Sequence, residues 1–172
     1  MTGFRSTTVS LPVLERLPVK LVLVMLSIAL ASCRPAAPPC PFTGEPEFAP
    51  SAGCLALVHG RILVIKNPEG KVGPPGGSAL EGEAAQCTAH RETFEETGLD
   101  LLPRQRLRTF DTGFNLYYCE IHSHSGSIAP KSFFEVQHAY WLPLDGFGEV
   151  QWRFPGQGQE LEQMLRSAMA GE

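Results

Sequence analysis

Residues 76–99 read GGSALEGEAAQCTAHRETFEETGL, and the composition of this stretch predicts a single helix with glycines on both sides. Alanine, glutamine, arginine and glutamate, which dominate its middle part, are good helix formers. Gly76 and Gly77 supply a turn before the helix, and Gly98 suits the left-handed conformation that ends many helices. We therefore expect a helix from about Glu83 to Thr97, with the rest of the chain organised around it.

Three carboxylates near the end of this stretch have the spacing of one helix face. Glu92, Glu95 and Glu96 follow one another at offsets that place their Cβ atoms roughly 5–6 Å apart. Carboxylates this close repel one another, and a hard cation relieves the repulsion. Mg²⁺ prefers oxygen ligands and binds through a few carboxylates together with substrate phosphates and water. Taken alone, the same acidic face is equally compatible with a solvated surface, the usual meaning of a run of like charges.

The residues around these carboxylates form a more specific pattern. From the N-terminal side, with gaps of five, seven, two and one residues, the fixed positions are Gly77, Glu83, Arg91-Glu92, Glu95-Glu96 and Gly98-Leu99. This spacing resembles the Nudix box, G-x5-E-x7-R-E-U-x-E-E-x-G-U, in which U is a bulky apolar residue. One position departs from the box, because Thr93 stands at the first U. The adjacent Phe94 offers bulk but points about 100° round the helix from it.

The Nudix resemblance implies a fold and a reaction. It implies one α/β domain, an α/β/α sandwich with a mixed sheet between helices, and it is compatible with about Ala52 to Ala170. The chemistry implied is hydrolysis of the diphosphate (pyrophosphate) bond in a nucleoside diphosphate linked to another moiety, with Mg²⁺, or Mn²⁺ in its place, as cofactor. The partner would then be a small-molecule nucleotide-diphosphate-type substrate. The alternative is a non-hydrolytic, Nudix-like nucleotide- or phosphate-binding module at the cell envelope.

The resemblance also assigns roles to residues of the helix. Glu95 and Glu96 are the expected principal metal ligands, and Glu92 is a further ligand or the general base. Arg91 is expected to pair with Glu83 and to hold the helix and the preceding loop in place rather than to contact substrate. We therefore count Glu92 and Arg91 as the catalytic group of the site.

Two further metal contacts are expected outside the helix. Many Nudix enzymes take an additional carboxylate from a loop or strand well after the box. Glu135 is our candidate, with Glu120 as the rival and a salt-bridged strand glutamate as the structural alternative. A backbone carbonyl near Gly76 could add a ligand, because glycines allow the backbone to approach closely.

The first 32 residues have the composition of a lipoprotein signal peptide. Basic residues precede the apolar run Leu21 to Ala31, which is too short to span a bilayer as a helix, a task that needs about 20 residues. The sequence Leu30-Ala31-Ser32-Cys33 resembles a bacterial lipobox, which implies cleavage before Cys33 and attachment of lipid to it. The alternative is an ordinary signal peptide with an incidental cysteine. We expect a lipid-anchored protein of a bacterial cell envelope, facing the periplasm.

The chain after this segment is divided by composition. Residues 33–51 are rich in proline and predict a semi-rigid tether, and residues 52–172 form the expected Nudix hydrolase domain. Apolar runs predict strands within 52–66, 100–121 and 133–142, and a terminal amphipathic helix over about 156–170. Independently of any resemblance, strands, helix, strands and helix in this order favour an α/β or α+β domain.

Composition and cysteine content complete the expectations. A hydrophobic content of 43% is that of a globular protein, and the net charge of −4 gives no support for nucleic-acid binding. With Cys33 lipidated, an even number of cysteines remains, which suggests disulfides in an exported chain. We favour Cys40–Cys54 and Cys87–Cys119, with buried free thiols as the alternative, above all for Cys54.

Overall fold

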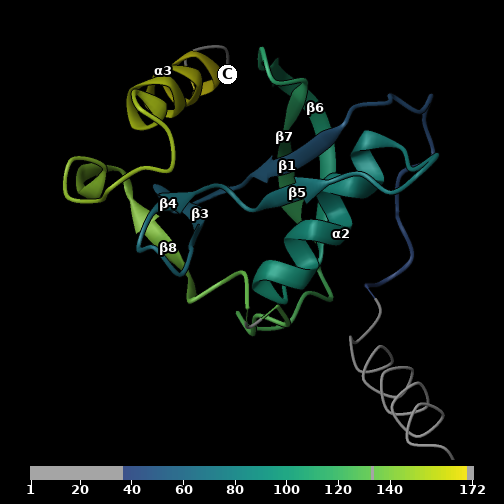
Figure 1. The fold of residues 1–172 in the computed structure, drawn as a ribbon, viewed down its shortest axis with the longest axis horizontal. Coiled ribbons are helices and arrows are strands. Elements are labelled where there is room, and N and C mark those ends of the chain that lie inside the picture. Colours follow the sequence, from purple (N-terminus) through teal and green to yellow (C-terminus); the bar gives the residue numbers. More distant parts are fainter. Residues whose placement is uncertain (1–36, 133, 170–172) are drawn as a thin grey trace, which may run out of the picture. The chain divides into compact units, whose positions relative to one another are not determined.

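The structure, a computed structural model, describes residues 37–132 and 134–169, which lie within the compact unit formed by residues 35–172 (Figure 1). The predicted signal peptide, residues 1–32, and the lipidation candidate Cys33 fall outside the described residues. No helix within the described part is long and apolar enough to cross a membrane.

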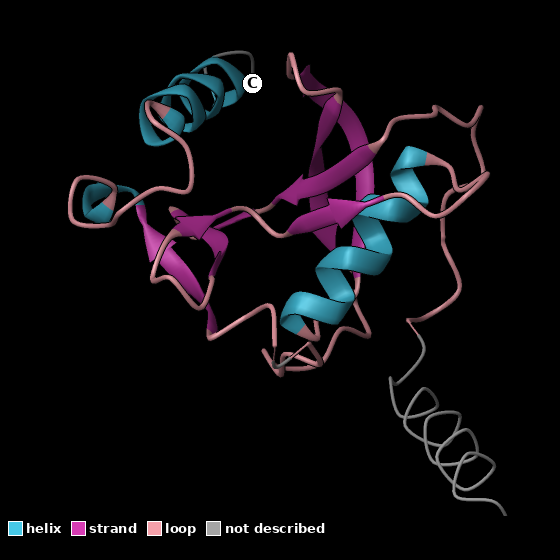
Figure 2. Cartoon of the chain, in the orientation of Figure 1, coloured by secondary structure: helices cyan, strands magenta, loops and turns pink. Residues whose placement is uncertain are grey.

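Two four-stranded sheets form the frame of the domain (Figure 2). The first has the strand order β5-β1-β7-β6, with bounds Gly76–Ser78, Ser51–Leu55, Phe114–Ile121 and Leu101–Thr109. The second has the order β2-β3-β4, with β8 also paired to β3; the bounds are Leu57–Val58, Arg61–Lys66, Val72–Gly73 and His138–Pro143. Strands β1 and β7 pair in parallel, whereas β5 pairs with β1 and β6 pairs with β7 in antiparallel orientation, so the first sheet is mixed, as predicted.

Two helices cover opposite sides of this frame. Side chains alternate along β1 and β3, as successive residues of a strand do. One face packs on α2 (Ala85–Thr97), in a buried cluster to which the strands contribute Cys54 and Leu63. The other face packs on α3 (Gln157–Met169), in a second cluster to which they contribute Leu55, Ile62 and Val64. The single α/β domain with a mixed sheet between helices is therefore confirmed.

Helix α2 begins two residues later than predicted. The backbone of Ala84 is extended, and Glu83 precedes the helix because its carboxylate accepts hydrogen bonds from the backbone N–H of Leu80 and the hydroxyl of Thr88. The C-terminal end agrees with the prediction, since Gly98 has a φ of 76° and closes the helix with a hydrogen bond to the carbonyl of Phe94.

The strand predicted over residues 133–142 is shorter in the structure. Strand β8 starts at His138, and Phe134 and Glu135 lie in a turn before it, because the carbonyl of Ser132 accepts hydrogen bonds from the N–H groups of Glu135 and Val136. A short 3₁₀-helix, η1 (Leu144–Gly146), follows β8.

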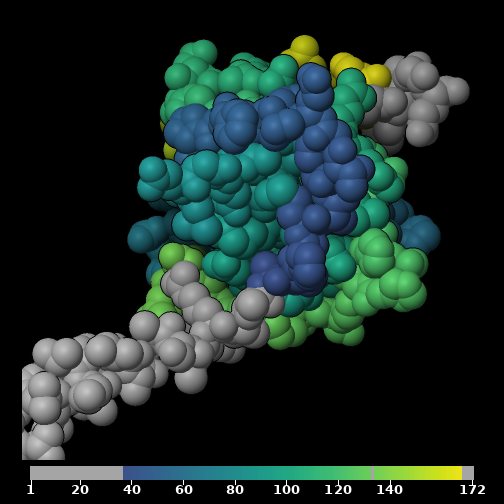
Figure 3. Space-filling view, turned by 90° about the vertical axis from the view of Figure 1, so that its right-hand side faces the viewer, coloured from purple at the N-terminus to yellow at the C-terminus, as the bar shows by residue number. Residues whose placement is uncertain are grey.

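The described part of the predicted tether is attached to the domain. Residues 37–50, here termed the N-terminal strap, run over the surface of the domain (Figure 3). Within it, the carbonyl of Glu47 accepts a hydrogen bond from the N–H of Ala85, and its carboxylate accepts bonds from Tyr117 and Arg106. These contacts cap the start of α2 and bind the strap to β6 and β7. Proline content alone did not reveal them, because the partners are distant in sequence.

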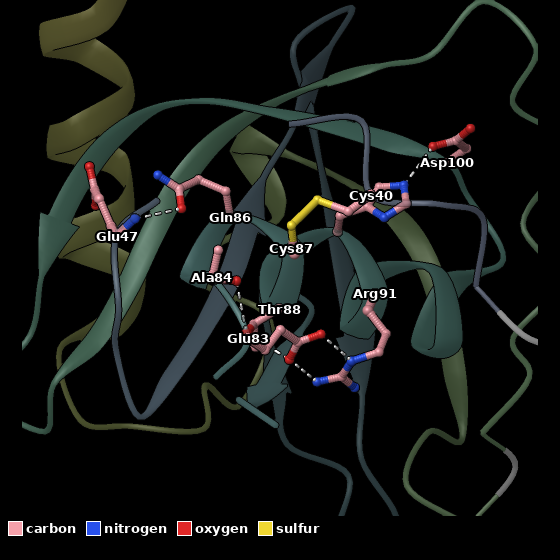
Figure 4. The surroundings of a disulfide bond; sticks show 10 residues. Cys40, Glu47, Glu83, Ala84, Gln86, Cys87, Thr88, Arg91 and Asp100 are labelled. Atoms are coloured by element: carbon pink, nitrogen blue, oxygen red, sulfur yellow. Dashed lines mark hydrogen bonds and ion pairs between the residues drawn. A yellow bond between two sulfur atoms is a disulfide. The ribbon is translucent and has the colours of Figure 1, made fainter. Parts of the chain in front are cut away.

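The disulfides join Cys40 to Cys87 and Cys54 to Cys119. The predicted pairing, Cys40–Cys54 and Cys87–Cys119, is wrong, although the same four cysteines take part. The register of the parallel strands explains the result, because Cys54 of β1 lies opposite Tyr117 of β7, and Cys119 shares the face of Tyr117 beneath α2. Cys87 of α2 is left to bond the strap through Cys40 (Figure 4).

Candidate active site

An open cleft of about 480 Å³ lies between helix α2 and the loops around it. It brings together β5, the C-terminal half of α2, the turn before β4, the turn before β8 and the loop before α3. The lining residues are Asn67, Pro68, Glu69, Gly76, Gly77, Ser78, Glu92, Glu96, Phe134, Glu135 and Arg153.

Glu96 is the most deeply buried carboxylate of the cleft, with 6% of its surface exposed. The backbone N–H of Gly76 donates a hydrogen bond to its Oε2 at 2.7 Å. Burial raises the pKa of Glu96 to about 8, although the hydrogen bond from Gly76 and the charge of Arg153 act in the opposite direction. The metal-free folded state thus disfavours the charged form of this carboxylate, which a cation would favour.

Glu92 lies against the backbone of β5. A Cβ on Gly77 would stand 2.5 Å from Cδ of Glu92, so any larger residue at position 77 would displace the carboxylate from this place. Burial raises the pKa of Glu92, while Arg91, whose Nη1 lies 2.7 Å from Oε1 of Glu92, counteracts part of the shift. Arg91 therefore fixes the orientation of this carboxylate.

Arg91 also ties α2 to the loop before it. Its Nε and Nη2 donate to the two oxygens of Glu83 at 2.9 and 2.8 Å (Figure 4). Nη2 also donates to the carbonyl of Ser78 at 2.9 Å. Hydrogen bonds from Arg91 are the main reason that the pKa of Glu83 falls to about 2. The predicted pair is present, and it contacts both the loop and Glu92.

Glu95, predicted together with Glu96 as a principal metal ligand, occupies a different place from Glu92 and Glu96. It does not line the cleft, and its Oε1 lies 3.6 Å from Nη1 of Arg91. Its backbone carbonyl accepts hydrogen bonds from the N–H groups of Lys131 and Ser132. Glu95 thus anchors the turn that carries Glu135.

Glu135 reaches the cleft through that anchored turn. Its carboxylate accepts a hydrogen bond from the hydroxyl of Ser132. Its negative charge contributes to the raised pKa of both Glu92 and Glu96. Glu120, the rival candidate, instead lies near the end of β7 and pairs with Arg104 at 2.8 Å on the surface. The structure therefore brings Glu135, and not Glu120, to the box carboxylates.

The carboxylates of the cleft fit a divalent cation in donor type and in electrostatics. Glu92, Glu96 and Glu135 supply hard oxygen donors, and their mutual repulsion is relieved by a cation. Among the described residues, no group of three or more acidic, histidine or cysteine side chains is arranged so that it could hold a metal ion by itself. Substrate phosphate and water would complete the coordination, as is usual for Mg²⁺.

Sequence reasoning missed Arg153 and Phe134 as cleft residues. An isolated bridge between Val72 and Trp152 holds the loop that carries Arg153 beside β4. Val72 and Trp152 are too far apart in the sequence for a local pattern to reveal this contact. Phe134 lies in a turn and not in the strand that the sequence predicts over 133–142, and 94% of its surface is exposed.

Comparison with known proteins identifies the same domain. The family model of the NUDIX domain matches residues 47–163. Among curated proteins, none matched the chain. The matched range starts within the strap and ends in α3, so it includes every residue of the cleft.

Solved structures share the fold at low sequence identity. A MutT NUDIX hydrolase from Burkholderia pseudomallei is 25% identical, with a TM-score of 0.52 over 66% of this chain and 95% of that one. An ADP-ribose pyrophosphatase from Streptococcus suis is 17% identical, with a TM-score of 0.56 over 69% and 90% of the two chains. A UDP-X diphosphatase is 15% identical, with a TM-score of 0.59 over 89% and 73%. With the family model matching most of its length, the chain belongs to the Nudix hydrolase family.

Proposed function

We propose that this Nudix hydrolase cleaves the diphosphate bond of a nucleoside diphosphate linked to another moiety, with Mg²⁺ as cofactor. The observation that carries the proposal is the convergence of Glu92, Glu96 and Glu135 in one open cleft beside the glycines of β5. The names of the structural neighbours, an ADP-ribose pyrophosphatase and a UDP-X diphosphatase, support this class of substrate.

The residues of the cleft have different roles in the proposed hydrolysis. A bound divalent cation would neutralise phosphate oxygens and acidify a water molecule. Glu92, Glu96 and Glu135 would hold the cation, and the N–H of Gly76 keeps Glu96 in place. Glu92 is a further ligand or accepts the proton of the attacking water, and Arg91 orients it for either role.

The same bonds form and break whether Glu92 acts as a metal ligand or as the base. The oxygen of water forms a new bond to phosphorus, the bond from that phosphorus to the bridging oxygen breaks, and the proton of water passes to a base. The two phosphate-containing products then carry the charge that the cleft and the cation neutralise.

The test is turnover of a panel of diphosphate compounds with and without Mg²⁺ or Mn²⁺. The panel includes nucleotide sugars, ADP-ribose, dinucleoside polyphosphates and a lipid diphosphate. We expect metal-dependent hydrolysis of one class, reduced by orders of magnitude in Glu96→Gln and unchanged in the control Glu120→Gln. Absence of turnover across the panel, with nucleotide binding retained, would favour the non-hydrolytic binding module instead.

The N-terminal sequence supports a second part of the proposal, attachment to the bacterial envelope through lipid on Cys33. The two disulfides of the domain support an oxidising compartment, because such bonds are rare in the cytosol. Mass spectrometry of the protein from a bacterial membrane fraction tests this. We expect a chain that starts at a diacylated Cys33, and loss of membrane association in Cys33→Ser; a soluble, unmodified mature chain would overturn it.

A further inference from the structure

The two disulfides of the domain differ in their access to solvent. Cys54 and Cys119 are 0% and 2% exposed in the buried cluster beneath α2, whereas Cys40 and Cys87 are both partly exposed. The two bonds span similar lengths of chain, 65 residues for Cys54–Cys119 and 47 for Cys40–Cys87. Loop-closure entropy grows only with the logarithm of loop length, so both bonds constrain the unfolded chain to nearly the same extent. Access to a thiol is therefore the property that distinguishes them.

Residues 37–46, the first part of the N-terminal strap, depend on the Cys40–Cys87 bond for their attachment. Within the described part of the chain, no hydrogen bond or ion pair joins them to the rest of the domain. Proline has no backbone N–H to donate, and four of these ten residues are prolines. A groove of about 390 Å³ remains between residues 41–44 and the start of β6, so the packing of this part of the strap is also incomplete.

The second part of the strap, residues 47–50, has attachments of its own. The carbonyl of Glu47 accepts a hydrogen bond from the N–H of Ala85 at 2.7 Å, and the N–H of Glu47 donates to Oε1 of Gln86 at 3.2 Å. The carbonyl of Pro50 accepts from the N–H of Ala79 at 3.0 Å. Opening of the Cys40–Cys87 bond therefore frees residues 37–46 but leaves the start of α2 capped.

The position of Cys87 decides which sulfur leaves when the bond is opened. Cys87 lies in the first turn of α2, which begins at Ala85, and Cys40 lies on the strap (Figure 4). The positive end of the helix dipole stabilises a thiolate in this turn. In thiol–disulfide exchange the better stabilised thiolate is the better leaving group, so the incoming thiolate attacks Sγ of Cys40.

We propose that the Cys40–Cys87 disulfide is a redox-sensitive latch, which a protein dithiol opens selectively to release residues 37–46 from the domain. One thiolate of the dithiol bonds to Sγ of Cys40, the disulfide bond breaks, and its electron pair leaves on Sγ of Cys87, which takes up a proton. The second thiolate of the dithiol then attacks its own partner sulfur in the mixed disulfide and releases Cys40, which is protonated in turn. The latch gains two electrons and two protons, and the dithiol becomes a disulfide.

One consequence of opening the latch rests on the proposed lipid attachment at Cys33. The first fixed residue after the anchor is Cys40, seven residues on, when the latch is closed, and Glu47, fourteen residues on, when it is open. Because a chain spans at most about 3.6 Å per residue, the maximum length of the tether doubles from about 25 to about 50 Å. The latch would then set how far the domain reaches from the membrane. Its opening does not itself need the lipid, so the test uses a chain without it.

Selective reduction tests the latch in the full chain with Cys33→Ser, which retains four cysteines. Thioredoxin is the dithiol, N-ethylmaleimide stops the reaction, and peptide mass spectrometry locates the alkylated cysteines. We expect Cys40 and Cys87 to be alkylated together, at least about tenfold faster than Cys54 and Cys119, because exchange needs access to the sulfur. A thioredoxin that lacks its second, resolving cysteine should be trapped on Cys40.

Chymotrypsin measures the release of the strap. Cleavage after Phe42, which is partly buried, requires residues 37–46 to leave the domain, and cleavage after Phe48, which is 69% exposed beside the Glu47 contacts, is the matched control. The double variant Cys40→Ser, Cys87→Ser holds the latch open without a reductant. We expect it to be cut after Phe42 at least about tenfold faster than the closed protein and after Phe48 within about twofold, because proteolysis follows the population of the open form.

These measurements also define what would overturn the proposal. Equal alkylation rates for all four cysteines, or faster alkylation of Cys54 and Cys119, would exclude a selective latch. Trapping of the partner on Cys87 would exclude the proposed order of attack. Unchanged cleavage after Phe42, or loss of the circular dichroism spectrum in the double variant, would make the bond a structural one. An unmodified Cys33 in the protein from membranes would remove only the consequence for the tether, and absent turnover would leave the latch unaffected.

Discussion

The ion pair between Glu83 and Arg91 should make the stability of the domain depend on acidic pH. The pKa of Glu83 falls from 4.5 to about 2 on folding, so the pair stabilises the folded state fully above pH 4.5 and loses its effect as the pH falls through 2. At 1.36 kcal/mol for each pH unit, the whole shift would be worth about 3 kcal/mol. Both side chains are partly exposed, and screening by water reduces the expected contribution to about 1–2 kcal/mol.

The assay is urea-induced unfolding of wild type and Glu83→Gln at pH 7 and pH 3. Glutamine keeps the size and the hydrogen-bond acceptor of the side chain but not its charge. We expect Glu83→Gln to lose about 1–2 kcal/mol at pH 7 and less than half of that at pH 3, where the unfolded carboxyl is already protonated. Glu81→Gln, which changes an exposed neighbour, is the control. An equal loss at both pH values, or none at pH 7, would refute this reasoning.

Other variants test the remaining contacts of the site. Thr93→Val should stabilise the domain by about 1 kcal/mol in urea unfolding, because Oγ1 of Thr93 is buried without a hydrogen-bond partner among the described residues; destabilisation would show that the hydroxyl is satisfied. Gly77→Ala should reduce turnover at least tenfold with the fold retained by circular dichroism, because its Cβ would displace the Glu92 carboxylate; full activity would contradict the close approach. Burial raises the pKa of Glu96 to about 8, so the folded state loses stability as the pH rises from 4.5 through 8, and the full cost of ionising this buried carboxyl is present above pH 8. Glu96→Gln should therefore raise the melting temperature of the metal-free protein at pH 8.5 and reduce its increase with Mg²⁺, and the opposite order would exclude Glu96 as a ligand.

The sequence predicted those parts of the site that depend on local spacing. Helix α2, its glycine cap and the Arg91–Glu83 pair all follow from residues within one stretch. The choice between Glu135 and Glu120 did not, because it depends on hydrogen bonds from Lys131 and Ser132 to the carbonyl of Glu95.

Features that depend on strand register were not readable from the sequence. The disulfide between Cys54 and Cys119 requires β1 and β7 to be parallel neighbours, and the place of Arg153 requires the bridge between Val72 and Trp152.

The Thr93 position agrees with the Nudix box in its environment but not in its residue type. The Nudix box predicts a bulky apolar residue there, and the structure buries the threonine completely, so the environment agrees with the box although the residue does not.

The most direct test of the central claim is hydrolysis in water enriched in ¹⁸O, with the substrate that the panel identifies. The account predicts that one phosphate-containing product gains a single ¹⁸O, that excess EDTA abolishes the reaction, and that Glu96→Gln slows it by orders of magnitude. Products without ¹⁸O on phosphorus, or a rate unaffected by EDTA, would contradict metal-dependent attack of water on the diphosphate in this cleft.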